Sequence, residues 1–141
     1  MILTEPRWKS YIVQTNNPIF SPKQCQMVIE AGRKQPRNDA EVGVGKKGIK
    51  SGALDTNVRT SHISWIPFAE MTDMYKDIEK TMLATNGNHF GFEGMQITEM
   101  AQYTEYPVGG FYDWHNDNEL NCQNEPPVRK ISMTILLSPE N

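Results

Sequence analysis

Two stretches of the chain repeat apolar residues at intervals of three and four, which places those residues on one face of an α-helix. The first opens at Ser21-Pro22, a capping residue followed by the proline that suits a first helical position, and is predicted to run to about Lys34. The second is predicted to begin at Pro67, to run to about Thr85 and to be stopped by Asn86-Gly87. Both patterns indicate amphipathic helices that pack one face on a core.

Other stretches alternate apolar and polar residues, which is the period of a half-buried β-strand. Together with the helices they predict an α+β chain whose helices cover one face of an antiparallel sheet. At 141 residues the chain suits a single domain, spanning residues 1–141. The predicted strands are 8–14, a short one near 40–44, 59–66, 95–103, 111–117 and 129–138.

The charge balance does not favour nucleic acid or an anionic membrane surface as a partner. The net charge is -3, and the only basic run is Lys46-Lys47. No apolar run approaches the roughly 18 residues of a membrane span, and the first residues lack the apolar centre of a signal peptide. Because Cys25 and Cys122 do not form a metal-binding spacing, we expect two free thiols in a reducing cytoplasm.

His115 and Asp117 are the candidate metal ligands. Phe111, Tyr112 and Trp114 favour a strand here, and residues two apart on a strand share a face, with Cα atoms roughly 7 Å apart. An imidazole and a carboxylate at that spacing can converge on one metal ion, Fe(II) or else Mn(II), Co(II), Ni(II) or Zn(II). A third ligand would complete a two-His-one-carboxylate triad. The alternative is a polar pair that only faces water.

The pattern around these residues resembles the 2-oxoglutarate- and Fe(II)-dependent dioxygenases, and within them the prolyl-4-hydroxylase-like branch that includes bacterial and phage members. The resemblance covers most of the chain, because it extends upstream through a cysteine-bearing first helix and an Asp-x-x-x-Arg segment (Asp55 to Arg59) to Asn-Gly-Asn-His-Phe-Gly-Phe. Its central residues are Tyr103, Gly110, Tyr112, His115, Asp117, Arg129-Lys130-Ile131-Ser132 and the stretch from Met133 to Leu137.

The resemblance implies a double-stranded β-helix (jelly-roll) core with two N-terminal supporting helices. It implies that His115 and Asp117 are catalytic residues that bind Fe(II), and that 2-oxoglutarate is decarboxylated to succinate while a prolyl or other side chain of a protein or peptide, or a small molecule, is hydroxylated. Ascorbate is left open as an additional cofactor. The expected location is the cytoplasm, or the host cytoplasm if the gene belongs to a phage.

The chain departs from the family pattern at its C-terminal end. The family has a Gly-Gly turn, further strands, a distal histidine ligand and a basic co-substrate residue, whereas this sequence stops at Ser138-Pro139-Glu140-Asn141. His62 and His89 lie upstream and do not match the distal position. We therefore expect a jelly roll that is incomplete at its C-terminal end. A non-catalytic binding or structural module that has lost half of its site is the alternative to an enzyme.

Several roles stay open at this point. Tyr103 matches the tyrosine whose hydroxyl helps to hold 2-oxoglutarate, but it could equally be a packed strand tyrosine with its hydroxyl in solvent. Arg129 is expected to pair with a carboxylate rather than with the co-substrate. The glycine- and lysine-rich loop from Gly43 to Gly52 predicts mobility, as a solvated turn or as a lid that excludes water from the site.

Overall fold

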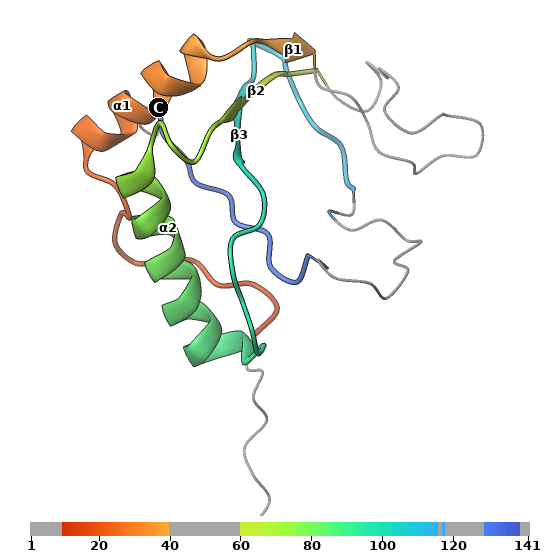
Figure 1. Cartoon of the computed structure of the whole chain (residues 1–141). Coiled ribbons are helices and arrows are strands. Elements are labelled where there is room, and N and C mark those ends of the chain that lie inside the picture. Colours follow the sequence, from red (N-terminus) through yellow and green to blue (C-terminus); the bar gives the residue numbers. More distant parts are fainter. Residues whose placement is uncertain (1–9, 40–59, 116, 118–128, 139–141) are drawn as a thin grey trace, which may run out of the picture.

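The computed structural model describes residues 10–39, 60–115, 117 and 129–138. Figure 1 shows two helices beside a small sheet. The elements in chain order are α1 (Pro22–Lys34), β1 (Asn38–Asp39), β2 (His62–Ile66), α2 (Thr72–Thr85), the π-helical turn η1 (Asn86–Phe90) and β3 (Ala101–Glu105).

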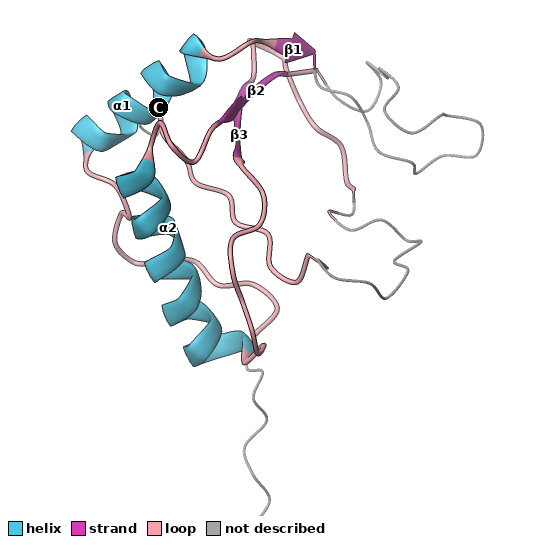
Figure 2. Cartoon of the chain, in the orientation of Figure 1, coloured by secondary structure: helices cyan, strands magenta, loops and turns pink. Residues whose placement is uncertain are grey.

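The described strands form one antiparallel sheet in the order β1-β2-β3. In its longer pairing Ile66 lies opposite Ala101 and Ser64 opposite Tyr103. Because paired residues project to the same face, these side chains all turn toward the helices. Figure 2 shows both helices on that one side of the strands, which agrees with the predicted arrangement of helices covering one face of an antiparallel sheet.

Helix α1 confirms the predicted boundaries because its signals are local. The Ser21 side chain accepts from the Gln24 backbone N–H at 3.3 Å, and the Gln24 side chain accepts from the Ser21 backbone N–H at 2.9 Å. This reciprocal pair is a capping box, with Pro22 following it inside the helix. Arg33 and Lys34 lie in the last turn, where positive charge suits the helix dipole.

Helix α2 begins at Thr72, five residues later than the start predicted at Pro67. Pro67 instead opens a turn, in which its carbonyl accepts from the Glu70 N–H at 3.1 Å. The α-helix ends at Thr85 as predicted. The chain then continues through η1, which is capped by Gly91. The φ of Gly91 is 71°, a conformation that favours glycine.

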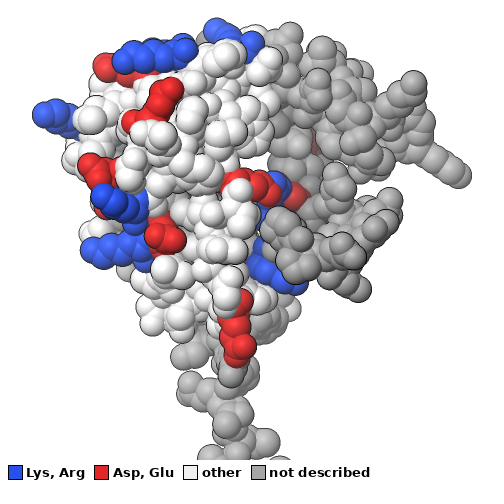
Figure 3. All heavy atoms as spheres, in the orientation of Figure 1, with Lys and Arg blue, Asp and Glu red and all other residues white. Residues whose placement is uncertain are grey.

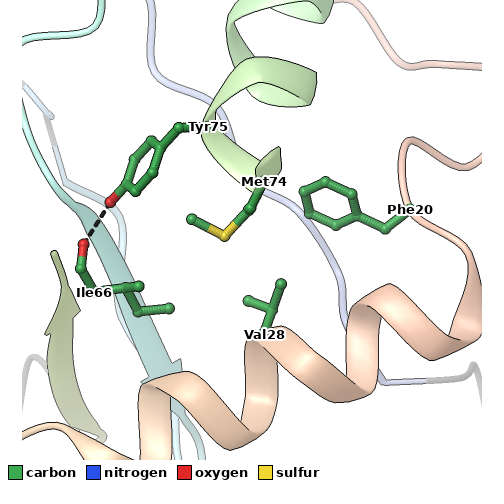
Figure 4. Close-up of a cluster of buried hydrophobic side chains, with 5 residues drawn as sticks. All are labelled: Phe20, Val28, Ile66, Met74 and Tyr75. Atoms are coloured by element: carbon green, nitrogen blue, oxygen red, sulfur yellow. Dashed lines mark hydrogen bonds between the residues drawn. The ribbon is translucent and has the colours of Figure 1, made fainter. Parts of the chain in front are cut away.

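The core lies between the helices and the sheet (Figure 4). Phe20 precedes α1, Val28 comes from α1, Ile66 from β2, and Met74 and Tyr75 from α2. The Tyr75 hydroxyl donates to the Ile66 carbonyl at 2.5 Å and accepts from the Ala101 N–H at 2.7 Å. One buried phenol therefore joins α2 to both long strands.

In the described residues three of the predicted strands are not found, and two others form only in part. No strand spans 111–115, where Tyr112 makes only an isolated bridge, and none is found in 10–14 or 129–138. The strand predicted at 95–103 begins only at Ala101 and continues to Glu105. The strand predicted at 59–66 is confirmed in its second part as β2. The strand near 40–44, the loop from Gly43 to Gly52 and Cys122 lie outside the described residues.

Alternation without pairing explains the error at 129–138. Ile131, Ile135 and Leu137 are half-buried while Ser132 and Thr134 are exposed, as the alternation predicts, but Met133, predicted on the buried side, is exposed. Ile135 and Leu137 pack against the core. Apolar alternation reports which side chains are buried, whereas a strand also needs a hydrogen-bonded neighbour.

In the described part of the chain, neither helix has the length and apolar character required to cross a bilayer. Cys25 lies on α1 and forms no disulfide. On the described part of the face in Figure 3, acidic and basic side chains lie interspersed rather than gathered by sign.

Candidate metal site

A tight turn at Pro107–Gly110 precedes the candidate ligands in the chain. The Gly110 N–H donates to the Pro107 carbonyl at 2.7 Å, and Gly109 has a φ of 78°, which favours glycine. Beyond the turn the Phe111 carbonyl accepts from the Thr60 N–H at 2.8 Å, which fixes the segment beside the approach to β2.

The backbone from Asp113 to His115 is shaped by local side-chain bonds instead of a strand ladder. The Asp113 carboxylate accepts from the Trp114 N–H at 2.8 Å, and the Asp113 carbonyl lies 2.8 Å from His115 Nδ1. Short polar side chains that bond nearby backbone groups compete with strand pairing. These bonds are the physical reason that the predicted strand is not formed here.

The same bonds orient the His115 imidazole. A carbonyl oxygen can only accept, so the contact with the Asp113 carbonyl places a ring proton on Nδ1. The ring also stacks on Tyr112, with centroids 3.6 Å apart and planes 13° apart. Metal-binding histidines commonly use the second nitrogen in this way, to fix the orientation of the first.

The Asp117 carboxylate lies at ion-pair distance from Nε2, the other ring nitrogen of His115. His115 Nε2 lies 3.1 Å from Asp117 Oδ1, so the sequence spacing correctly predicts that the two side chains converge. Two ligand atoms bonded at right angles to one first-row metal, each at about 2.1 Å, are separated by about 3.0 Å. The separation of the two atoms is therefore compatible with adjacent positions on one metal ion.

Arg129 holds the other end of Asp117. Its Nη1 donates to the Asp117 carbonyl oxygen at 2.6 Å, and its Nη2 donates to the Glu99 carboxylate. The expectation that Arg129 pairs with a carboxylate is confirmed. Glu99 was not singled out by the sequence, because it lies 30 residues from Arg129 and no local pattern connects the two.

Among the residues that the structure describes, no group of three or more His, Cys, Asp and Glu side chains could hold a metal. His115 and Asp117 are thus two candidate ligands to which the described ranges add no third. Their donor set, one neutral nitrogen and one carboxylate oxygen, suits a divalent first-row metal and leaves positions for other ligands.

Tyr103 lies on the helix-facing side of β3, where its ring packs against the backbone of Gly32. Its hydroxyl interacts with Glu105 and Arg33, and burial, followed by the nearby Glu105 carboxylate, raises the pKa of the phenol. Arg33 donates to Glu105 at 2.9 and 2.6 Å. The contacts described here for Tyr103 are therefore with α1 and β3, and none of them is with His115 or Asp117.

An open apolar depression of about 410 Å³ is lined by Trp65, Phe68, Thr98, Glu99 and Met100. Glu99 belongs both to this wall and to the ion pair with Arg129. The Glu99–Arg129 pair therefore connects the depression to Asp117.

Comparisons of the chain with known protein families, with curated proteins and with solved structures find no match.

Proposed function

We propose that the chain is an Fe(II)- and 2-oxoglutarate-dependent dioxygenase that hydroxylates a prolyl or other side chain of a protein or peptide. A small-molecule substrate belongs to the same proposal. The observation that carries it is the arrangement of His115 and Asp117. Nε2 of the first and Oδ1 of the second lie 3.1 Å apart, and the second nitrogen of the imidazole is occupied by a backbone carbonyl.

In this proposal His115 and Asp117 hold the iron. Iron with bound 2-oxoglutarate and oxygen supplies the oxidising chemistry that hydroxylates the substrate and yields succinate and carbon dioxide. The chain's own residues set the position of the metal. The Asp113 carbonyl and the Tyr112 ring fix the imidazole.

Tyr103 is proposed to hold a carboxylate of 2-oxoglutarate. A phenol can donate to a carboxylate, and the Tyr103 hydroxyl already interacts with the carboxylate of Glu105. Its neighbours Arg33 and Glu105 already interact with the hydroxyl. Binding of the co-substrate at this position would have to exchange one of those partners.

The fold proposed with this function is the jelly roll, and the proposed location is the cytoplasm. The Cys25 thiol, which forms no disulfide, suits a reducing compartment. The interspersed surface charge in Figure 3 supports a protein, peptide or small-molecule substrate over nucleic acid.

Metal titration tests the proposal. Fe(II) or Mn(II) is added anaerobically to the wild type, to a His115→Ala/Asp117→Ala double variant and to a His89→Ala control, which removes a histidine from η1 instead. We expect measurable binding to the wild type and the control and its loss in the double variant. Indistinguishable curves for all three proteins would refute the site.

Turnover then separates an enzyme from a non-catalytic jelly-roll module. Succinate is measured after incubation with 2-oxoglutarate, Fe(II), ascorbate and oxygen. An active enzyme would form succinate, and His115→Ala would abolish it. Metal binding at His115 and Asp117 without succinate formation would favour the non-catalytic module, for which the two-ligand set of the described residues is the supporting observation.

A further inference from the structure

Asp117 lies outside any helix or strand, so no ladder of backbone hydrogen bonds fixes its position. The bond that the structure gives its backbone comes from a side chain: Arg129 Nη1 donates to its carbonyl oxygen at 2.6 Å. His115, in contrast, is held through Asp113 and Tyr112. The two candidate ligands therefore have separate anchors.

The Arg129 guanidinium is itself held by Glu99, two residues ahead of β3. A guanidinium is planar and rigid, so a fork that binds Glu99 with one nitrogen and the Asp117 carbonyl with another sets the distance between them. The guanidinium therefore links Asp117 to the segment that leads into β3.

The exposure of the Arg129–Glu99 ion pair indicates whether the pair contributes mainly to overall stability or mainly to the position of Asp117. The side chains of Arg129 and Glu99 are 38% and 54% exposed, and ion pairs as exposed as these contribute little to overall stability. Their consequence is therefore local. Removing the pair releases the backbone of Asp117 and leaves the core and the His115 anchors in place.

We propose that Arg129, oriented by Glu99, is a positioning residue that holds Asp117 in place for metal binding. The inference rests on the proposed metal site. It adds that the proposed metal site depends on the carboxylate of Glu99, in the segment before β3. The His-x-Asp motif does not identify Glu99, because that residue lies well before the motif in the chain.

Metal affinity in four variants tests the proposal. Arg129→Gln is expected to weaken Mn(II) binding roughly 10- to 100-fold, the effect typical of losing a partner of a metal ligand. Glu99→Gln is expected to weaken it less, because Arg129 keeps its bond to Asp117. Adding Glu99→Gln to Arg129→Gln should cause no further loss, since Glu99 acts through Arg129.

Arg33→Gln is the matched control, because it breaks another exposed Arg–Glu pair, with Glu105, away from the candidate ligands. Its Mn(II) affinity should equal that of the wild type. Equal weakening in Arg33→Gln and Arg129→Gln, or independent additive losses from Glu99→Gln and Arg129→Gln, would overturn the positioning role. The absorption spectrum of bound Co(II) should change in Arg129→Gln and stay unchanged in Arg33→Gln.

Amide NMR spectra of the metal-free protein separate this inference from the proposed function. Arg129→Gln should shift the amide signal of Asp117 and leave those of Val28 and Met74 in the core unchanged. Shifts at Asp117 in a protein that binds no metal would refute the metal site and keep the structural link. Unchanged signals at Asp117, with metal binding intact, would refute the link alone.

Discussion

Replacing Gly32 by alanine tests how closely α1 approaches the sheet. A Cβ at position 32 would lie 2.3 Å from Tyr103 Cγ, 2.4 Å from its Cδ1 and 2.8 Å from its Cβ. Ordinary van der Waals contact begins at 3.4 Å, so the shortfall at Cγ is about 1 Å. Because the clash reaches the base of the ring, rotation of the Tyr103 side chain about its Cβ–Cγ bond cannot relieve it.

The magnitude follows from two opposing effects. Overpacking costs about 1–3 kcal/mol, and a clash with the base of a ring belongs at the upper end of that range. Inside a helix, alanine is more favourable than glycine by about 1 kcal/mol of free energy. We therefore expect Gly32→Ala to lower the free energy of unfolding by about 2 kcal/mol.

A second substitution shows whether the ring is the cause. In a Tyr103→Ala background the contacts with Cγ and Cδ1 are absent and only the 2.8 Å approach to the Cβ of residue 103 remains, so Gly32→Ala should cost clearly less than in the wild type. The difference between the two costs measures the coupling between positions 32 and 103. Gly87→Ala is the control, because its added Cβ meets nothing within 4 Å. It should be neutral or slightly stabilising.

Urea unfolding of the wild type, the single variants and the double variant measures these free energies, with the slope m checked for constancy. A neutral or stabilising Gly32→Ala in the otherwise unchanged protein would refute the close packing of α1 on Tyr103. Purely additive effects would show that some other neighbour of Gly32 bears the strain.

Tyr75→Phe should destabilise the fold by about 1–3 kcal/mol in urea unfolding, because it leaves the Ile66 carbonyl and the Ala101 N–H without their partner at unchanged packing; a cost near zero would contradict a structural role for this hydroxyl. Glu105 should contribute pH-dependent stability, because hydrogen bonding from Arg33 holds the pKa of its carboxyl below the ordinary value of 4.5. A carboxyl with a lowered pKa stabilises the fold above about pH 4.5 and loses that contribution as the pH falls through its folded pKa, since the unfolded chain takes up the proton first. The stability difference between wild type and Glu105→Gln should therefore shrink between pH 6 and pH 3 in chemical unfolding, and a constant difference would refute the assignment.

The elements that could be predicted from the sequence are those with local causes. Helix α1 has its signals in neighbouring residues, namely Ser21, Pro22 and Gln24. The start of α2 was misplaced because Pro67 suits a turn as well as a first helical position, and the bond to Glu70 decides for the turn. Propensity alone does not distinguish these outcomes.

In the candidate site too, contacts between neighbouring residues could be predicted from the sequence, whereas contacts between distant segments could not. The spacing of His115 and Asp117 predicted their convergence, although the strand on which the prediction relied is absent and local bonds from Asp113 produce it instead. The link from Arg129 to Glu99 depends on tertiary contact between distant segments. The metal itself stays a prediction of the sequence and of the fit between the two ligand atoms.

The two faces of the sheet give a physical argument for the proposed jelly roll. Ile66, on the face toward the helices, is 1% exposed, whereas its neighbour Trp65 on the opposite face is 38% exposed. Met100 is 42% exposed and lines the same depression as Trp65. A jelly roll packs a second sheet over the first, and such a sheet would remove apolar surface of this kind from water. The depression beside Glu99 would then become an enclosed space next to the Arg129–Asp117 bond, as the proposed chemistry requires, because oxidation of a C–H bond needs a site from which water is excluded.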